Sequence, residues 1–165
     1  MSTDVQPSRP ISVVTKAFDW IAQVADLFQP AFLLATRWYV SWQFLNSGRL
    51  KVTNWDSTLG LFRDEYHVPL LPPHAAAITG VFGELFFPTL LVLGIGGRLG
   101  ALGLFAVNVM AVVSYRQVLL ADGSEAALAQ HVLWGFMLAV LCVFGNGPLA
   151  LDRLLAKRLP ASRAR

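Results

Sequence analysis

Two ionisable side chains and one amide lie inside stretches of sequence that are otherwise apolar. Arg37, Glu84 and Asn108 each belong to a different stretch, and the last two lie about ten residues from its end. At 1.5 Å per helical residue, that depth is close to the middle of a hydrocarbon layer about 30 Å thick. A charge there costs about 2.5–3.5 kcal/mol, so we expect these groups to face one another or a cavity.

Two hypotheses explain this polar set. One is an Arg37–Glu84 pair, aided by Asn108, that only fixes the register of the helices. The other is a polar pocket for a ligand head group or a proton path, which ionisable groups inside a membrane often mark. A carboxyl group at that depth can also be protonated, and Glu84 would then donate a hydrogen bond.

The three histidines form a second candidate set, predicted to lie at one end of the molecule. They are His67, His74 and His131, and Glu65 and Tyr66 are expected at the same level. Their shared level suggests a ligand or metal site, and three separate surface histidines are the alternative. No H-x-x-x-H or C-x-x-C spacing strengthens the metal hypothesis.

Common catalytic patterns are missing from the sequence. There is no seryl-hydrolase, P-loop or dinucleotide-binding motif, because the glycines of GIGGR open an apolar segment rather than a βαβ unit. Cys142 is the single cysteine and lies in an apolar run, where it is predicted to be a small buried hydrophobe. Electron chemistry would therefore need a bound cofactor or a partner.

The composition is that of a membrane protein. Hydrophobic residues make up 55% of the 165 residues and charged residues only 14%, against about a quarter in soluble domains. The charge is missing from blocks about twenty residues long, which is typical of helices in lipid. The pattern predicts an all-α fold, a membrane four-helix bundle with spans at 31–50, 74–95, 99–119 and 126–146.

Two further helices are predicted around these spans. Residues 11–28 form an amphipathic stripe that suits an interfacial helix lying on the membrane, with Pro30 opening the first span. In the loop 51–73, apolar residues at three- and four-residue spacing predict a short amphipathic helix across the mouth of the bundle. The chain then divides into an N-terminal segment 1–29, a bundle 30–146 and a basic tail 147–165.

The basic residues predict the orientation. The side that holds the N-terminus, the GIGGR turn and the tail carries eight of them, and the opposite side carries four. The positive-inside rule therefore places both termini in the cytoplasm. Because the net charge of +3 is concentrated in the tail, it indicates a topology signal or a contact with anionic lipid and argues against nucleic-acid binding.

The pattern resembles the DoxX family of small four-helix membrane proteins. The matching residues are Arg37, then N-S-G-R-L-K at 46–51, then G-E at 83–84 before an apolar run that ends in Gly94 and Arg98. The resemblance implies a protein of the bacterial inner membrane. The resemblance adds Asn46 and Lys51 to the candidate cofactor-binding set. The full set is then Arg37, Asn46, Lys51, Glu84 and Asn108.

The resemblance also implies a function, because the family includes a subunit similar to the thiosulfate:quinone oxidoreductase of archaea and others thought to assist redox or detoxification partners. We therefore expect a quinone as the cofactor and a partner redox protein or a second copy of the chain as the partner. Quinones need an apolar slot and one or two donors. Those donors are predicted at mid-depth or at the outer rim, where the candidates are Tyr66, His74 and His131.

Two alternatives remain open. The first is a non-catalytic membrane scaffold for a partner. The second is a metal-stress protein, since the loop WDSTLGLFRDEYHVPLLPP looks like a DoxX branch found beside enzymes that modify copper-binding peptides.

Overall fold

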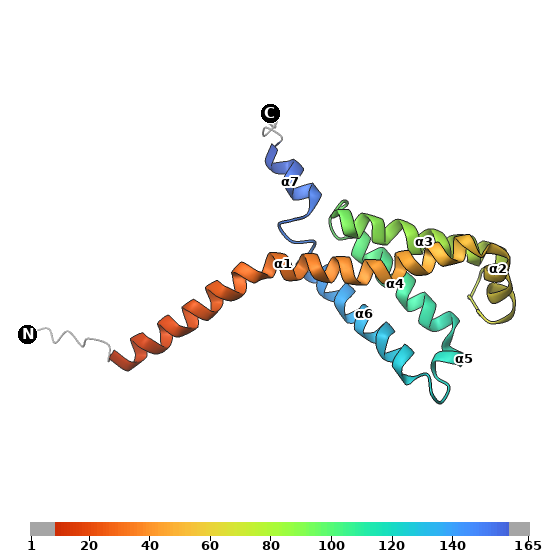
Figure 1. The fold of residues 1–165 in the computed structure, drawn as a ribbon, viewed down its shortest axis with the longest axis horizontal. Helices are drawn as coiled ribbons and strands as arrows, with labels where there is room; N and C mark the ends of the chain where they lie inside the picture. Colours follow the sequence, from red (N-terminus) through yellow and green to blue (C-terminus); the bar gives the residue numbers. More distant parts are fainter. Residues whose placement is uncertain (1–8, 159–165) are drawn as a thin grey trace, which may run out of the picture.

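The computed structural model describes residues 9–158, and this part of the chain is helical with no strand. Figure 1 shows seven helices in chain order. Their bounds are α1 Arg9–Thr53, α2 Trp55–Asp64, α3 Pro73–Leu93, α4 Leu99–Ser114, α5 Arg116–Leu119, α6 Glu125–Phe144 and α7 Leu151–Arg158. The expected all-α membrane bundle, with a short helix in its first long loop, is confirmed.

Helix α1 is one continuous helix of 45 residues, with Pro30 inside it. The segment 11–28 is helical as predicted, but the expected boundary at Pro30 is wrong, because this helix continues into the first predicted span. A proline removes one backbone donor and crowds the preceding turn, which kinks a helix without always ending it. Figure 1 shows a bend in α1, with its N-terminal part projecting away from the bundle. Apolar side chains on that part, such as Phe18 and Leu27, are exposed.

The other predicted spans match α3 and α6 closely, and the third span is shorter than expected. Its helix α4 ends at Ser114, and Tyr115 separates it from the single turn of α5. The 16 residues of α4 extend about 24 Å. Among the described helices, α3 and α6 are long and apolar enough to cross a membrane, and α4 is a shorter apolar helix.

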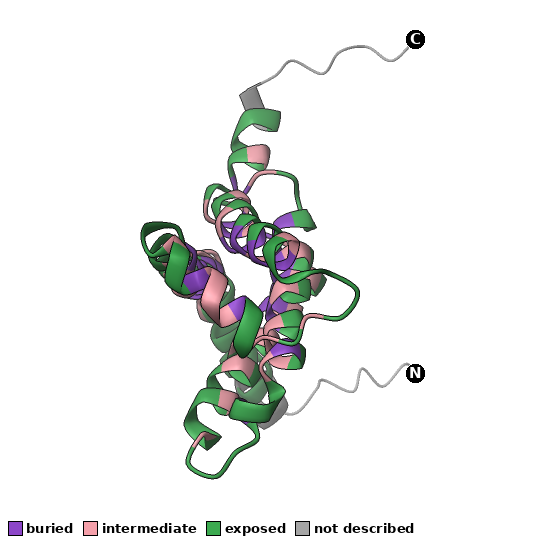
Figure 2. Cartoon of the chain, turned by 90° about the vertical axis from the view of Figure 1, so that its right-hand side faces the viewer, coloured by how far each residue is buried: buried purple, intermediate pink, exposed green. Residues whose placement is uncertain are grey.

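Four helices form the bundle, arranged in a ring in which α1 packs on α3, α3 on α4, α4 on α6 and α6 on α1. Figure 2 shows the bundle from the end that carries α2, with buried residues on the faces that the helices turn toward one another. The main apolar core contains Leu33, Val40, Leu91, Leu104 and Leu141, from all four helices.

At one end of the bundle, α7 and the turn between α3 and α4 lie together. The backbone N–H of Gly97 donates to Asp152 Oδ2 at 2.9 Å, and the N–H of Asp152 donates to the carbonyl of Gly94 at 3.2 Å. Gly94 has a φ of 69°, the left-handed conformation with which many helices end. We call this the α7 end and the opposite one the α2 end.

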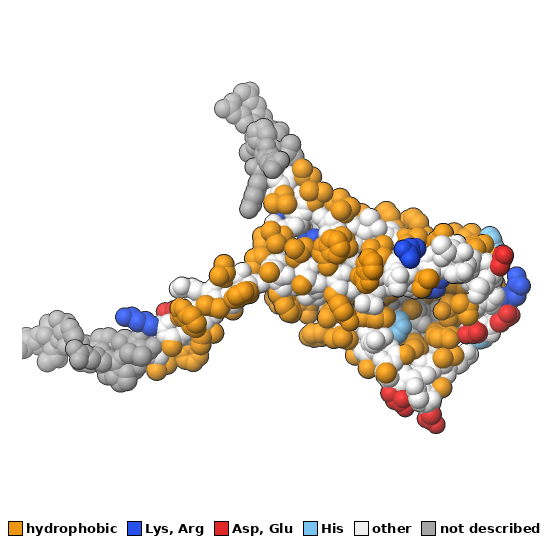
Figure 3. All heavy atoms as spheres, in the orientation of Figure 1, with side chains coloured by type: hydrophobic (Ala, Val, Ile, Leu, Met, Phe, Trp, Pro, Cys, Tyr) orange, Lys and Arg blue, Asp and Glu red, His pale blue; other side chains and the backbone are white. Residues whose placement is uncertain are grey.

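At the α2 end, the short amphipathic helix predicted from the spacing of its apolar residues is α2, which packs on α3. Phe62 is buried against Ala76 and Ala77, and Trp55, Leu59 and Tyr66 pack around them. Figure 3 shows apolar side chains over much of the visible face of the bundle and acidic side chains gathered at the α2 end. In Figure 1, α1 and α6 diverge toward this end.

Candidate functional site

A cavity of about 520 Å³ lies in the half of the bundle nearer to α2. All four bundle helices line it, together with α2 and the loop that follows it, and most of its lining side chains are apolar. The polar residues in the lining are Gln43, Ser47, Lys51, Tyr66, Thr79, Glu84, Ser114, Tyr115, His131 and Trp134. A mostly apolar cavity with a few converging polar groups is the usual form of a small-molecule site.

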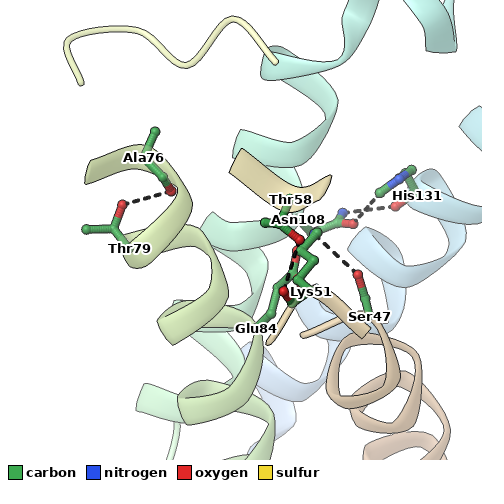
Figure 4. A network of polar contacts seen from close by, with 8 residues as sticks. All are labelled: Ser47, Lys51, Thr58, Ala76, Thr79, Glu84, Asn108 and His131. Carbon is green, nitrogen blue, oxygen red and sulfur yellow. Dashed lines mark hydrogen bonds and ion pairs between the residues drawn. The ribbon is translucent and has the colours of Figure 1, made fainter. Parts of the chain in front are cut away.

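The centre of the polar set is an ion pair between Lys51 and Glu84, shown in Figure 4. Lys51 lies in the last turn of α1 and Glu84 in the middle of α3. Gly48 explains why the two can meet, since a Cβ on it would lie 3.1 Å from that of Glu84. The absence of a side chain lets α1 and α3 approach closely, and Lys51 reaches back to the carboxylate from one turn farther on.

Further hydrogen bonds hold Lys51 in place. Its ammonium group donates to Ser47 Oγ at 3.3 Å, and Thr58 Oγ1 donates to its backbone carbonyl at 3.0 Å, which ties α2 to the end of α1. The ammonium also lies 6.0 Å from the ring centroid of Tyr66, within reach of a cation–π contact. The pair is therefore fixed by α1, α2 and α3 together.

A second polar group joins α4 to α6. Asn108 Oδ1 and His131 Nδ1 are 2.9 Å apart, and Asn108 Nδ2 donates to the backbone carbonyl of His131 at 3.0 Å. The imidazole also meets the ring of Trp134 edge-on, with centroids 5.0 Å apart. Because the two hydrogen bonds use both ends of the amide, Asn108 orients His131 at the cavity wall.

Three residues that line the cavity carry a buried polar atom with no hydrogen-bond partner within the described part of the chain. These atoms are Glu84 Oε2, Ser114 Oγ and Trp134 Nε1. Buried polar groups in native proteins nearly always have a partner, and leaving one without costs about 1–3 kcal/mol. These three atoms mark places beside the cavity where the described residues leave a hydrogen bond unmade.

Tyr66 adds a phenol to the wall at the α2 end. Burial, with smaller effects from Tyr115, Glu84 and Glu65, raises its pKa to about 12. Tyr66 therefore keeps its proton at neutral pH and can donate a hydrogen bond. Its ring meets that of Tyr115 edge-on at 4.9 Å, and the Tyr115 hydroxyl donates to Glu65 Oε2 at 3.1 Å.

Arg37 lies outside this site, and its expected pairing with Glu84 is wrong. Its guanidinium donates to the backbone carbonyls of Leu91 at 3.0 Å, Val92 at 2.8 Å and Asn146 at 2.6 Å. Arg37 is almost fully buried, at 1% exposure. It joins the C-terminal end of α3 to the segment after α6, and Lys51 supplies the countercharge of Glu84.

Of the other four candidate cofactor-binding residues, three belong to the polar groups around the cavity and one does not. Lys51, Glu84 and Asn108 come together around the cavity, since Asn108 holds the lining residue His131. Asn46 is exposed and is not part of the lining.

The structure does not bring the three histidines together. His67 Nδ1 lies 2.9 Å from the carbonyl of Glu65, the ring of His74 meets Trp55, and only His131 lines the cavity. Within the described residues, no group of three or more His, Cys, Asp or Glu side chains could hold a metal ion.

Sequence reasoning missed Ser47, Ser114 and Trp134 as site residues. Two of them had a usable signal, because Ser47 lies four residues before Lys51 and Trp134 three residues after His131, so each pair shares a helix face. Ser114 had none, since it closes an apolar helix and its level depends on where α4 ends.

Comparison with known proteins gives two matches. A model of the family described as DoxX matches residues 32–117, which is more than half of the chain. A protein of Haemophilus influenzae described as "Uncharacterized protein" is 28% identical over 130 residues, covering 78% of this chain and 85% of the relative. No solved structure matches the chain.

Proposed function

Because this chain belongs to the DoxX family, we propose that it binds a membrane quinone in the cavity and serves as a redox or stress-response accessory subunit. The protein is a multi-pass protein of the bacterial inner membrane in this proposal. Helices α1, α3, α4 and α6 each cross the bilayer once.

The observation that carries this proposal is the cavity itself. Its volume of about 520 Å³ lies in the usual range of small-molecule sites, about 300–1,000 Å³. A quinone has an apolar body and carbonyl oxygens that only accept hydrogen bonds. The indole N–H of Trp134 only donates, and it is buried without a partner in the described residues. Trp134 and Tyr66 both line the cavity, and we propose their N–H and O–H groups as the donors to the quinone carbonyls.

The shape of the bundle supports entry from the lipid. Helices α1 and α6 diverge toward the α2 end (Figure 1), and residues of both line the cavity. We therefore propose that a molecule dissolved in the membrane enters the cavity between these two helices.

The orientation follows from charge. The α3–α4 turn and α7 touch at one end of the bundle, so their basic residues lie on the same side. The positive-inside rule makes this the cytoplasmic side and places both termini there. The cavity then lies in the outer half of the membrane.

A redox role needs a partner, since the single cysteine, Cys142, cannot form a dithiol pair. The partner is a redox protein or a second copy of this chain. The N-terminal part of α1 is a candidate contact, because its apolar side chains, among them Phe18, Leu27 and Phe28, are exposed and project from the bundle. This exposed arm also favours the second candidate function, a non-catalytic scaffold.

The test is quinone binding by the full-length protein in quinone-free lipid nanodiscs. A short-chain quinone should quench the emission of Trp134, measured as the difference between the wild type and Trp134→Phe. The matched control is Trp20→Phe, which removes an exposed tryptophan on the α1 arm and should leave the quenching by the cavity ligand intact. Quenching that is the same in all three proteins would overturn the proposal and leave the scaffold function.

A further inference from the structure

The cavity has no net charge of its own. Of the residues that line it, only Lys51 and Glu84 carry a full charge at neutral pH, with His131 counted as neutral, and these two are paired with each other. Both are mostly buried, with side chains 16% and 9% exposed. An ionised group that entered the cavity would lose its hydration and find each possible countercharge already neutralised.

The surroundings of the pair reinforce this balance. Lys51 also donates to Ser47 and lies near the Tyr66 ring, so its ammonium is held on several sides. Glu84 keeps one buried oxygen without a partner in the described residues. The wall therefore offers hydrogen bonds and no free charge, an arrangement that favours polar but uncharged head groups.

We propose that the cavity admits uncharged head groups and excludes ionised ones because Lys51 and Glu84 neutralise each other, so that neither charge is free to pair with a ligand. The physical basis is the cost of moving a charge from water into a site without a free counterion, which is several kcal/mol even after relaxation. Specificity of this kind comes from penalising the wrong ligand rather than from extra contacts to the right one. The inference rests on the proposed function in treating the cavity as a binding site, and it adds the residues that select the ligand.

The experiment compares three amphiphiles with the same chain and different head groups: dodecanol, dodecanoate and dodecylammonium. Each is added to the full-length protein in nanodiscs of zwitterionic lipid, and binding is read from Trp134 emission at equal concentration of the probe in the membrane. Dodecanol should bind wild-type protein roughly tenfold more tightly than either ion, since one unpaired charge in a partly buried site costs at least that much.

Charge variants then reverse the preference. Glu84→Gln leaves Lys51 unpaired and should raise the affinity for dodecanoate roughly tenfold, while Lys51→Met should do the same for dodecylammonium. The double variant has no net charge and should regain the preference for dodecanol. Arg49→Gln and Asp64→Asn are matched controls, because they remove exposed charges that do not line the cavity.

Two results would overturn this inference. One is equal binding of the three amphiphiles by the wild type, a measurement that does not depend on the folding of any variant. The other is a folded Glu84→Gln protein that gains no affinity for dodecanoate. The proposed function fails separately: a protein that prefers dodecanol yet binds no quinone keeps the charge selectivity and loses the quinone role.

Discussion

At the scale of single residues, Arg37 shows how one side chain can join three backbone segments. Two of its acceptors, the carbonyls of Leu91 and Val92, lie in the last turn of α3, where helix carbonyls have no partner within the helix. The third, from Asn146, follows α6. A positive charge also suits the negative end of a helix dipole. Arg37 is thus explained by structure alone.

Replacing this arginine should destabilise the bundle. Arg37→Ala removes this donor from the carbonyls of Val92 and Asn146, whereas the carbonyl of Leu91 keeps the N–H of Gly94 at 3.2 Å. We expect a loss on the order of 3 kcal/mol in the free energy of unfolding. Arg37→Lys should fall between alanine and the wild type, because an ammonium cannot reproduce the planar fork. Arg49→Ala, an exposed arginine on the same helix, is the control and should change stability by less than about 0.5 kcal/mol. Thermal unfolding in detergent measures all three, and equal stability of Arg37→Ala and the control would contradict this role.

The raised pKa of Tyr66 predicts that the stability of the folded protein falls in the alkaline pH range. Its pKa of about 12 in the folded protein lies above the ordinary value of 10.0, so the unfolded chain releases this proton first. The stabilisation is complete below the ordinary pKa and is lost as pH rises from about 10 to about 12, because over that range the folded state binds more protons. Tyr66→Phe should flatten this part of the stability curve. The component of the phenolate absorbance that titrates near pH 12 in the wild type should be missing in the variant.

At the scale of helices, glycines decide how closely neighbours pack. Gly103 on α4 lies against Phe87 on α3, and a Cβ at that position would lie 2.1 Å from the ring. Gly60 on α2 has open space, with nothing within 4 Å of its added Cβ. Replacing glycine by alanine should therefore have opposite effects on the stability of the protein at these two positions.

We expect Gly103→Ala to destabilise the protein by about 1–3 kcal/mol through overpacking between α3 and α4. Gly60→Ala should stabilise it by up to about 1 kcal/mol, because alanine is the better residue inside a helix. Thermal unfolding of both variants checks the pair. If the two changes have the same sign, the close approach of α3 and α4 at Gly103 is incorrect.

The limits of prediction from sequence also appear at this scale. Apolar runs between prolines and glycines gave α3 and α6 almost to the residue, since Pro73 opens one helix and Gly94 ends it. Pro30 failed as a boundary because the residues on both sides still favour a helix, and one missing hydrogen bond does not outweigh them. The end of α4 at Ser114 could not be read, because no proline or glycine marks it and the next glycine is Gly123.

The ion pair was missed for a geometric reason. Arg37 contacts the Leu91 carbonyl, and Glu84 lies seven residues earlier on α3, about 10 Å farther along the bundle. An antiparallel α1 places Gly48, not Arg37, beside Glu84, and the long side chain of Lys51 reaches that level from the end of the helix. The sequence predicts the approximate depth of each residue, whereas pairing depends on the register between two helices.

At the scale of the whole molecule, packing differs between the two ends of the bundle. At the α7 end the apolar core and the Arg37 hydrogen bonds hold the four helices together. At the α2 end α1 and α6 diverge and the cavity lies between the helices. This division places the cavity beside the packed end of the bundle, which can fix the polar groups that a ligand of the proposed kind would meet.

The four membrane crossings that we propose predict which side of the membrane each segment faces. A reporter that is active only in the cytoplasm should work when fused to either terminus. A reporter active only outside should work when inserted at Asp122 or Gly123, in the turn between α5 and α6, because that turn lies at the α2 end. The same insertion at Gly96, in the turn that contacts α7, should be inactive. If the two termini report opposite sides, the number of crossings is odd, and the cavity can no longer be placed in the outer half of the membrane.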